Sequence, residues 1–151
     1  MQDKTRLLKM SDLKLAAAMD AELFDDSWTS EDFSQYIADH TCKIIGTFRD
    51  RKLVGYACVA FYGRRIAIDR LCINDGDDDD PATVKLIAAM KQILPAGGQV
   101  RLEIEVQLED SDTLALFKAD GFVARPWANG KYVHPRTEQV RLCYLPAVTP
   151  L

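Results

Sequence analysis

Several stretches of the chain alternate apolar and polar residues with a period of two, the pattern of a half-buried β-strand. The longest spans 100–108, where the even-numbered positions are Val, Leu, Ile, Val and Leu and the odd-numbered ones are charged or polar. We expect its apolar side chains to face a core and Arg101, Glu103 and Glu105 to form a solvated or salt-bridged face. Further strands are predicted for 5–10, 42–48, 53–62, 65–73, 122–127 and 138–145.

Apolar residues recur every three to four positions in other stretches, which predicts amphipathic helices. These stretches are 12–24, 29–40, 82–94 and 111–120. We expect Ser11 and Ser111 to cap the first and last of them, and Thr29 or Ser30 to start the second. Gly121 is expected to end the last helix.

The resulting order of elements, β-α-α-β-β-β-α-β-α-β-β, predicts an α/β (α+β) fold. We expect a mixed central sheet of about six or seven strands with about four helices on its faces. Since the chain has 151 residues, the length of one ordinary domain, we expect a single domain over 1–151.

The composition of the chain argues against several classes of function. The net charge of −4 argues against a nucleic-acid-binding protein, which needs a basic face. No apolar run approaches the roughly 18–20 residues that span a bilayer, and the first residues do not form a basic and then apolar signal peptide. We therefore expect a cytoplasmic protein without membrane contact. The four cysteines lack CxxC spacing and lie in apolar stretches, which predicts buried free thiols.

The most unusual stretch is acidic: five of the six residues from Asp75 to Asp80 are aspartate, and Pro81 follows them. Asp80 is a good N-cap and Pro81 suits the first position of a helix, which explains one or two of these carboxylates. The others leave two alternatives open. The carboxylates of the chain fill an anion site at this helix start, or Asp75, Asp77 and Asp79 bind a divalent metal. The glycine and the closing glutamate of an EF-hand loop are missing, so our main expectation is that no metal binds.

Three segments, taken together and in order, resemble the GNAT superfamily of acetyl-CoA-dependent N-acetyltransferases. They are "FDDSWTSEDF" (24–33), "IEVQLEDSDTLALFKADGF" (104–122) and "EQVRLCYLP" (138–146). They look most similar to the branch that acetylates the N-terminal alanine of a ribosomal protein. The resemblance implies the GNAT fold, acetyl-CoA as cofactor, and a small amine or a peptide N-terminus as acceptor.

The chain departs from the family in the loop that holds the cofactor. In the family, a strand leads through Arg/Gln-x-x-Gly-x-Gly/Ala into a helix, and backbone N–H groups there bind the pyrophosphate. Leu71 and Ile73 match the end of the strand. Asp78, however, takes the place of the arginine, and Pro81 and Thr83 replace the two glycines. Pro81 has no N–H to donate, and Asp78 repels a phosphate, so the resemblance implies a damaged cofactor site.

The chemistry that the resemblance implies is only partly kept. Glu105 matches a carboxylate that can accept the proton of the amine. Phe117 replaces the tyrosine that protonates the departing thiolate, and Asp110 replaces an asparagine. Tyr132 lies where the similar branch has tyrosines near the acceptor, and it is a weaker candidate for the missing hydroxyl.

Two functions remain open from the sequence. The first is a GNAT-fold binding or regulatory module without ordinary acetyl-CoA use; the second is an active N-acetyltransferase with an atypical cofactor loop. In the family fold the segments 74–80 and 109–112 border one cleft, so the resemblance also implies an acidic cleft that suits a basic partner.

Overall fold

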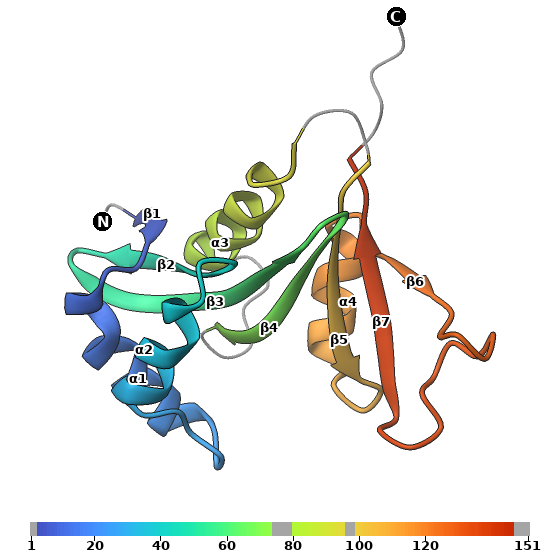
Figure 1. Ribbon diagram of the computed structural model, residues 1–151, viewed down its shortest axis with the longest axis horizontal. Coiled ribbons are helices and arrows are strands. Elements are labelled where there is room, and N and C mark those ends of the chain that lie inside the picture. Colours follow the sequence, from blue (N-terminus) through green and yellow to red (C-terminus); the bar gives the residue numbers. More distant parts are fainter. Residues whose placement is uncertain (1–2, 74–79, 96–98, 147–151) are drawn as a thin grey trace, which may run out of the picture. The chain divides into compact units, whose positions relative to one another are not determined.

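The computed structural model describes residues 3–73, 80–95 and 99–146, and within them it contains four α-helices and seven strands. Hydrogen-bonded neighbours in the sheet follow the order β1-β2-β3-β4-β5-β7-β6 (Figure 1). The predicted mixed sheet and helix number are thus confirmed. The elements are β1 (Asp3–Leu7), α1 (Leu13–Leu23), α2 (Ser30–Ala38), β2 (Cys42–Arg49), β3 (Lys52–Tyr62), β4 (Arg65–Ile73), α3 (Pro81–Gln92), β5 (Arg101–Gln107), α4 (Ser111–Ala119), β6 (Val123–Arg125) and β7 (Gln139–Tyr144).

The chain divides into two compact units, which are described separately. Unit 1 comprises Met1–Phe61 and Asp69–Ile93, and unit 2 comprises Tyr62–Ile68 and Leu94–Leu151. Strand β4 contributes to both, because 65–68 belong to unit 2 and 69–73 to unit 1. The single domain over 1–151 stays a prediction.

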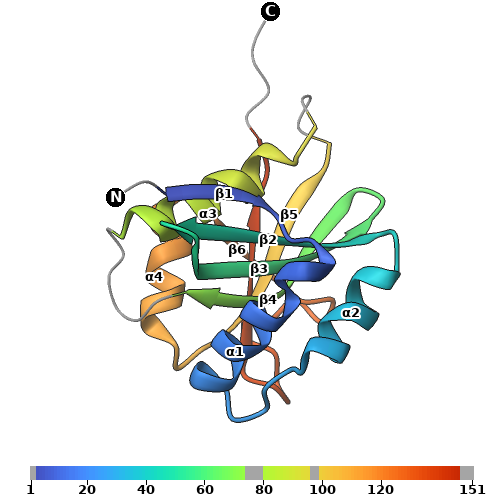
Figure 2. The same cartoon turned by 90° about the vertical axis from the view of Figure 1, so that its left-hand side faces the viewer.

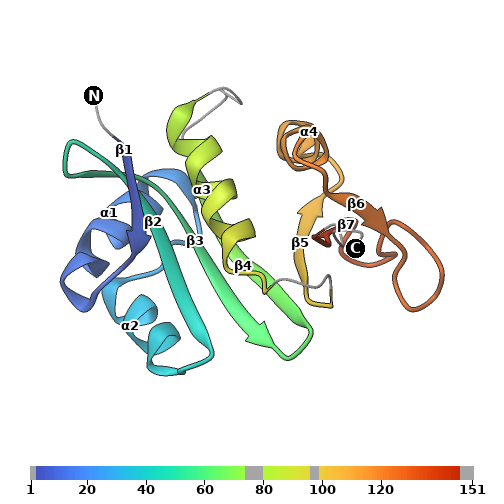
Figure 3. The same ribbon diagram turned by 90° about the horizontal axis from the view of Figure 1, so that it is seen from above.

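Unit 1 is built around an antiparallel set of strands. Strand β1 pairs with β2, and β2 pairs with β3. The predicted hairpin between β2 and β3 is confirmed: Asp50 and Arg51 form its turn with positive φ angles of 50° and 73°, as in the turns that match the twist of a hairpin. Helices α1 and α2 cover one face of these strands and α3 the other (Figures 2 and 3).

Unit 2 pairs β5 in parallel with 65–68 of β4 and antiparallel with β7, which in turn pairs with β6. The even-numbered residues Leu102, Ile104 and Val106 are buried, as the alternation predicted. Helix α4 is fixed to this unit by Phe117, whose ring meets that of Phe122 edge to face at 4.9 Å.

Two predicted helix caps were wrong. Ser11 lies inside a short 3-10 turn, Met10–Asp12, and α1 begins only at Leu13. The buried Asp12 fixes this entry instead, because its carboxylate accepts the Lys9 N–H at 2.7 Å. The first strand is displaced accordingly, to Asp3–Leu7 rather than 5–10.

At α4, Ser111 is the first helical residue, and the cap is Asp110, whose carboxylate accepts the Thr113 N–H. Other local predictions were confirmed. Thr29 caps α2, Gly121 follows α4 with a φ of 91°, and the four cysteines are free and buried.

Candidate functional site

The start of α3 is where the sequence placed a damaged phosphate site. Asp80 is the N-cap, and its Oδ1 accepts the Ala82 N–H at 2.9 Å. Pro81 occupies the first helical position and has no N–H. The side chain of Thr83 is buried, while Leu71 and Ile73 are half-buried at the end of β4. Of the first two backbone nitrogens of this helix, one therefore carries no proton and the other already serves the chain's own carboxylate.

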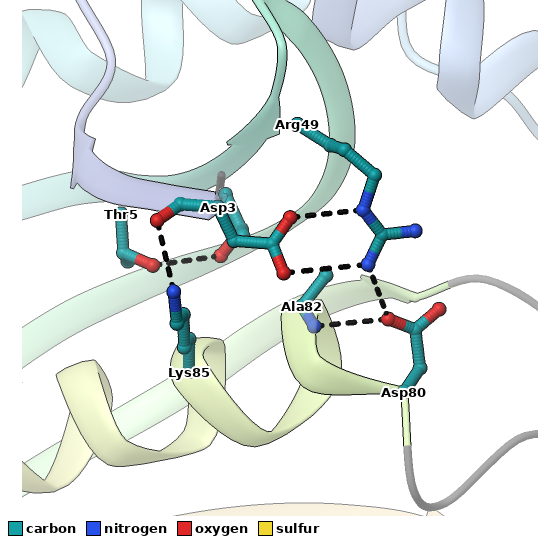
Figure 4. Close-up of polar contacts among 7 residues, drawn as sticks. Asp3, Thr5, Arg49, Asp80, Ala82 and Lys85 are labelled. Carbon is teal, nitrogen blue, oxygen red and sulfur yellow. Dashed lines mark hydrogen bonds and ion pairs between the residues drawn. The ribbon is translucent and has the colours of Figure 1, made fainter. Parts of the chain in front are cut away.

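A set of ion pairs and hydrogen bonds, which we term the Arg49 clasp, surrounds that cap; its members are Asp3, Arg49, Asp80 and Lys85. Arg49 Nε lies 2.9 Å from Asp3 Oδ1, and Arg49 Nη2 lies 2.8 Å from Asp80 Oδ1 (Figure 4). Lys85 Nζ donates to the Asp3 carbonyl oxygen at 2.9 Å. The clasp holds β1, β2 and the start of α3 together, and its two positive and two negative groups balance.

The clasp keeps its carboxylates charged. The hydrogen bond from Arg49 lowers the pKa of Asp3 below its ordinary value. The hydrogen bond from the Ala82 N–H, followed by that from Arg49, lowers the pKa of Asp80. An anionic ligand at this helix start would thus meet the charged carboxylate of Asp80. Among the described residues, Arg49 is the cation paired with Asp80, and it is already shared with Asp3.

Asp75, Asp77, Asp78 and Asp79 lie outside the described residues. Among the residues that are described, no group of three or more His, Cys, Asp or Glu side chains is arranged to hold a metal ion.

Glu105, the candidate base, lies in unit 2 on an exposed part of β5. It is directly opposite Arg141 of β7, and the closest approach is 3.9 Å between Glu105 Oε1 and Arg141 Nη2. The Arg141 guanidinium lies 4.2 Å from the centre of the Trp127 ring, which holds it in place. The Trp127 indole N–H donates to the Gln139 carbonyl and thereby fixes the ring. Glu105 is therefore accessible and not hydrogen-bonded to its nearest cation.

Glu103, two residues earlier, is only 5% exposed, so of the two predicted alternatives, a solvated or a salt-bridged face, the structure has the salt-bridged one at this position, and the pair is buried. Its carboxylate lies 2.5 Å from Arg101 Nε and 3.5 Å from Arg65 Nη1. Burial alone would raise the pKa of Glu103, but the Arg101 hydrogen bond and nearby arginine charges outweigh it, and the pKa is lowered. Glu103 has a structural role and is not available as a base.

The remaining candidates are dispersed in unit 2. Phe117 is completely buried in the core and has no hydroxyl, so it offers no proton. Asp110 serves as the cap of α4. Tyr132 is exposed in the segment that also carries Trp127, and among the described residues no hydrogen bond involves its hydroxyl group.

Sequence reasoning missed a buried polar network in unit 1. The carboxylate of Asp20 is inaccessible to solvent and accepts hydrogen bonds from Arg70 Nε at 2.8 Å and Nη2 at 2.7 Å. It also accepts the Trp28 N–H at 2.6 Å and the Tyr56 hydroxyl. Burial would raise the pKa of Asp20, but these donors, Arg70 first, lower it. Arg70 itself lies over the rings of Phe24 and Trp28.

A sequence signal for this network did exist. Arg70 lies two residues before the buried Cys72 in β4, so the two share a strand face. Asp20 continues the buried stripe of α1 that begins with Leu13 and Ala16. A charged residue at such a position requires a buried partner of opposite charge, and these two positions are complementary.

Comparisons with known proteins agree on the fold. No protein-family model matches the sequence, and no curated protein matches it. Among solved structures, the ribosomal-protein-S18-alanine N-acetyltransferase of Escherichia coli superposes with a TM-score of 0.74 at 12% identity, over 99% of this chain and 97% of that chain. The Thermoplasma acidophilum PaiA N-acetyltransferase, solved in complex with coenzyme A, gives 0.75 at 14% identity, over 96% and 99%.

A single-site mutant of the spermidine N-acetyltransferase SpeG of Vibrio cholerae gives a TM-score of 0.69 at 16% identity, over 95% of this chain and 94% of that chain. The chain therefore has the fold of the GNAT N-acetyltransferases, as its sequence resemblance predicted. Within the described part of the chain, no helix is long and apolar enough to span a membrane.

Proposed function

We propose that this chain is a GNAT-fold binding or regulatory module that does not use acetyl-CoA in the ordinary way. The observation that carries the proposal is the start of α3, where the Asp80 carboxylate already accepts the Ala82 N–H and Pro81 has no N–H to offer. GNAT enzymes of this fold include one solved with coenzyme A. A pyrophosphate approaching α3 in the same manner would have to displace Asp80 and break its ion pair with Arg49.

The energetic comparison favours the internal carboxylate. A helix start binds an anion through free N–H groups and its partial positive charge, and Asp80 uses both. A micromolar ligand needs about 8 kcal/mol of net binding free energy. Each added like charge at about 5 Å opposes that by roughly 3 kcal/mol at an effective dielectric near 20. Asp78 and its neighbouring aspartates directly precede this helix start in the sequence and carry further negative charge.

The residues at this position thus do not fit a coenzyme A pyrophosphate. A second function, N-acetyl transfer to an amine or a peptide N-terminus, is favoured by one observation. Glu105 is exposed and not hydrogen-bonded to Arg141, so it can accept a proton from an amine. Two proteins of similar structure are named for their substrates, which are an alanine of ribosomal protein S18 and spermidine.

Calorimetric titration with acetyl-CoA separates the two functions. We expect no saturable binding to the wild-type chain at micromolar concentrations. A variant with Asp78→Arg, Asp80→Gly, Pro81→Gly and Thr83→Gly restores the arginine, the glycines and the free Ala82 N–H, and it should gain measurable affinity. Since Thr83 is buried, a second variant keeps Thr83 and changes the other three positions.

The matched control is Glu22→Arg with Asp25→Asn, which makes the same total charge change of +3 at exposed positions outside the two acidic segments. Micromolar binding of acetyl-CoA to the wild type would refute the proposed function and favour the enzyme. In that case, release of the coenzyme A thiol in the presence of amines, abolished by Glu105→Gln, would identify the active N-acetyltransferase. Equal gains in the loop variants and in the control would show that net charge alone, not the helix start, decides affinity.

A further inference from the structure

A row of three charged side chains crosses the sheet of unit 2. Glu105 of β5 is directly opposite Arg141 of β7, and Arg141 is directly opposite Arg125 of β6. Residues directly opposite one another on neighbouring strands project from the same face. One carboxylate and two guanidinium groups therefore line up side by side, and we term them the Glu105 row.

The surroundings of this row are also rich in arginine. Arg65 and Arg101 lie on the same face of β4 and β5, and both are paired with the buried Glu103. With Arg125 and Arg141 this face carries more positive than negative groups, although the whole chain has a net charge of −4. The face is thus locally suited to an anionic group rather than to a polycation.

Arg141 is held in place but has unused hydrogen-bonding capacity. The Trp127 ring fixes its guanidinium at 4.2 Å, while Glu105 stays 3.9 Å away, beyond hydrogen-bond distance. Its Nε is buried and has no hydrogen-bond partner among the described residues. That buried Nε is closed to a ligand, but the Nη groups of this pre-oriented guanidinium, which lie no closer than 3.9 Å to Glu105, can bind a ligand carboxylate in two-point contact.

We propose that the Glu105 row binds a peptide N-terminus that carries an acidic side chain at its first or second position. The ligand's ammonium group pairs with Glu105, and its carboxylate pairs with Arg141 and Arg125. A polyamine or a basic N-terminus lacks the second pairing and meets two guanidinium groups instead. The proposal names the ligand of the binding module proposed above and rests on that function.

The test is a calorimetric titration of the full chain, without acetyl-CoA, with two hexapeptides that differ only at position two. Ala-Asp-Ala-Ala-Ala-Tyr should bind about tenfold more tightly than Ala-Lys-Ala-Ala-Ala-Tyr, the size expected for one charge-assisted pair. The N-acetylated form of the aspartate peptide, which lacks the ammonium group, should bind about tenfold more weakly than the free form.

Variants assign each contact. Arg125→Gln and Arg141→Gln should each reduce the preference for the aspartate peptide, and Glu105→Gln should remove the preference for a free over an acetylated N-terminus. Arg136→Gln is the control, because it removes the same charge from an exposed residue of unit 2 outside the row. Arg141 packs on Trp127 and its variant can unfold, so the exposed Arg125 keeps the test decisive.

Equal affinity for the two peptides, a preference for the lysine peptide, or an Arg136→Gln effect as large as that of Arg125→Gln would overturn the proposal. Acetyl-CoA is titrated separately. Micromolar acetyl-CoA binding with the aspartate preference intact refutes the proposed function and supports the row's specificity. Absence of acetyl-CoA binding together with equal peptide affinities refutes this inference alone.

Discussion

In unit 1, Arg70 holds Asp20 through two hydrogen bonds of 2.8 and 2.7 Å, whereas in unit 2 the groups of Arg141 and Glu105 approach only to 3.9 Å. The Asp20 carboxylate is fully buried and also accepts the Trp28 N–H and the Tyr56 hydroxyl. The Glu105 side chain is 46% exposed. Both arginines lie over a tryptophan ring, so the arginine environment alone does not distinguish the pairs.

The two pairs differ in the hydrogen-bonding capacity that remains available to another molecule. All the hydrogen-bonding capacity of Asp20 is directed at the chain itself, which fits a structural role that ties α1 to β3 and β4. Glu105 and Arg141 keep capacity for another molecule. A buried, fully satisfied pair is costly to break, and an exposed, loosely paired one is worth little to stability. Substitutions in the Asp20–Arg70 pair should therefore change mainly stability, and substitutions in the Glu105–Arg141 pair should change mainly ligand binding.

The largest effect is expected for Asp20→Asn. This change leaves the half-buried Arg70 without its charged partner and should lower the free energy of unfolding by about 3–5 kcal/mol. Urea unfolding followed by circular dichroism measures it. Glu22→Gln, an exposed change in the same helix, is the control and should stay within about 0.5 kcal/mol. Similar losses for both would mean that Asp20 has no special role.

The same carboxylate should make stability depend on acid. The Arg70 and Tyr56 hydrogen bonds hold the folded-state pKa of Asp20 below its unfolded value of about 3.9. Its contribution is thus fully present above the unfolded pKa and is lost as the pH falls toward the folded pKa. Wild-type stability should decline below about pH 4, and Asp20→Asn should show a shallower decline. Parallel pH profiles for the two proteins would contradict this.

Much of this could be read from the sequence, and the reasons are local. The alternation in 100–108 predicted β5, and Asp80 with Pro81 predicted the start of α3, because these features depend on neighbouring residues. The Ser11 cap failed because the carboxylate of Asp12, one residue later, accepts the Lys9 N–H and fixes the entry to the helix. Helix starts with two adjacent polar candidates are decided by packing as well as by propensity.

The Asp20 network, the Arg49 clasp and the Glu105–Arg141 pair each depend on residues far apart in the chain. Asp20, Tyr56 and Arg70 meet only after α1, β3 and β4 have packed, and no local pattern specifies that meeting. Arg49 reaches Asp80 in the same way, across 31 positions. The register that sets Arg141 opposite Glu105 is likewise a property of the sheet. Local periodicity predicts elements, whereas cross-strand and helix–strand partners require the tertiary structure.

A smaller effect is expected for Tyr56→Phe, which removes one donor to Asp20 and leaves the Arg70 pair intact. We expect a loss of about 1.5–3 kcal/mol in the free energy of unfolding, the range for a hydrogen bond to a charged group. Tyr62→Phe is the matched control, because the Tyr62 ring is half exposed and its contact with Arg65 involves the ring face rather than the hydroxyl. A loss in the control as large as in Tyr56→Phe would remove the distinction.

The smallest effect on stability is expected in unit 2, and a double-mutant cycle measures it. Arg141→Gln also loses packing on Trp127, so its own stability change overstates the ion pair. The coupling energy between Glu105→Gln and Arg141→Gln cancels that packing loss, and we expect it to be below about 0.5 kcal/mol. The same cycle with Asp20→Asn and Arg70→Gln should give a coupling energy of about 2–3 kcal/mol. A coupling of that size between Glu105 and Arg141 would show that this pair stabilises the fold as the Asp20–Arg70 pair does. Neither group would then be free for a ligand.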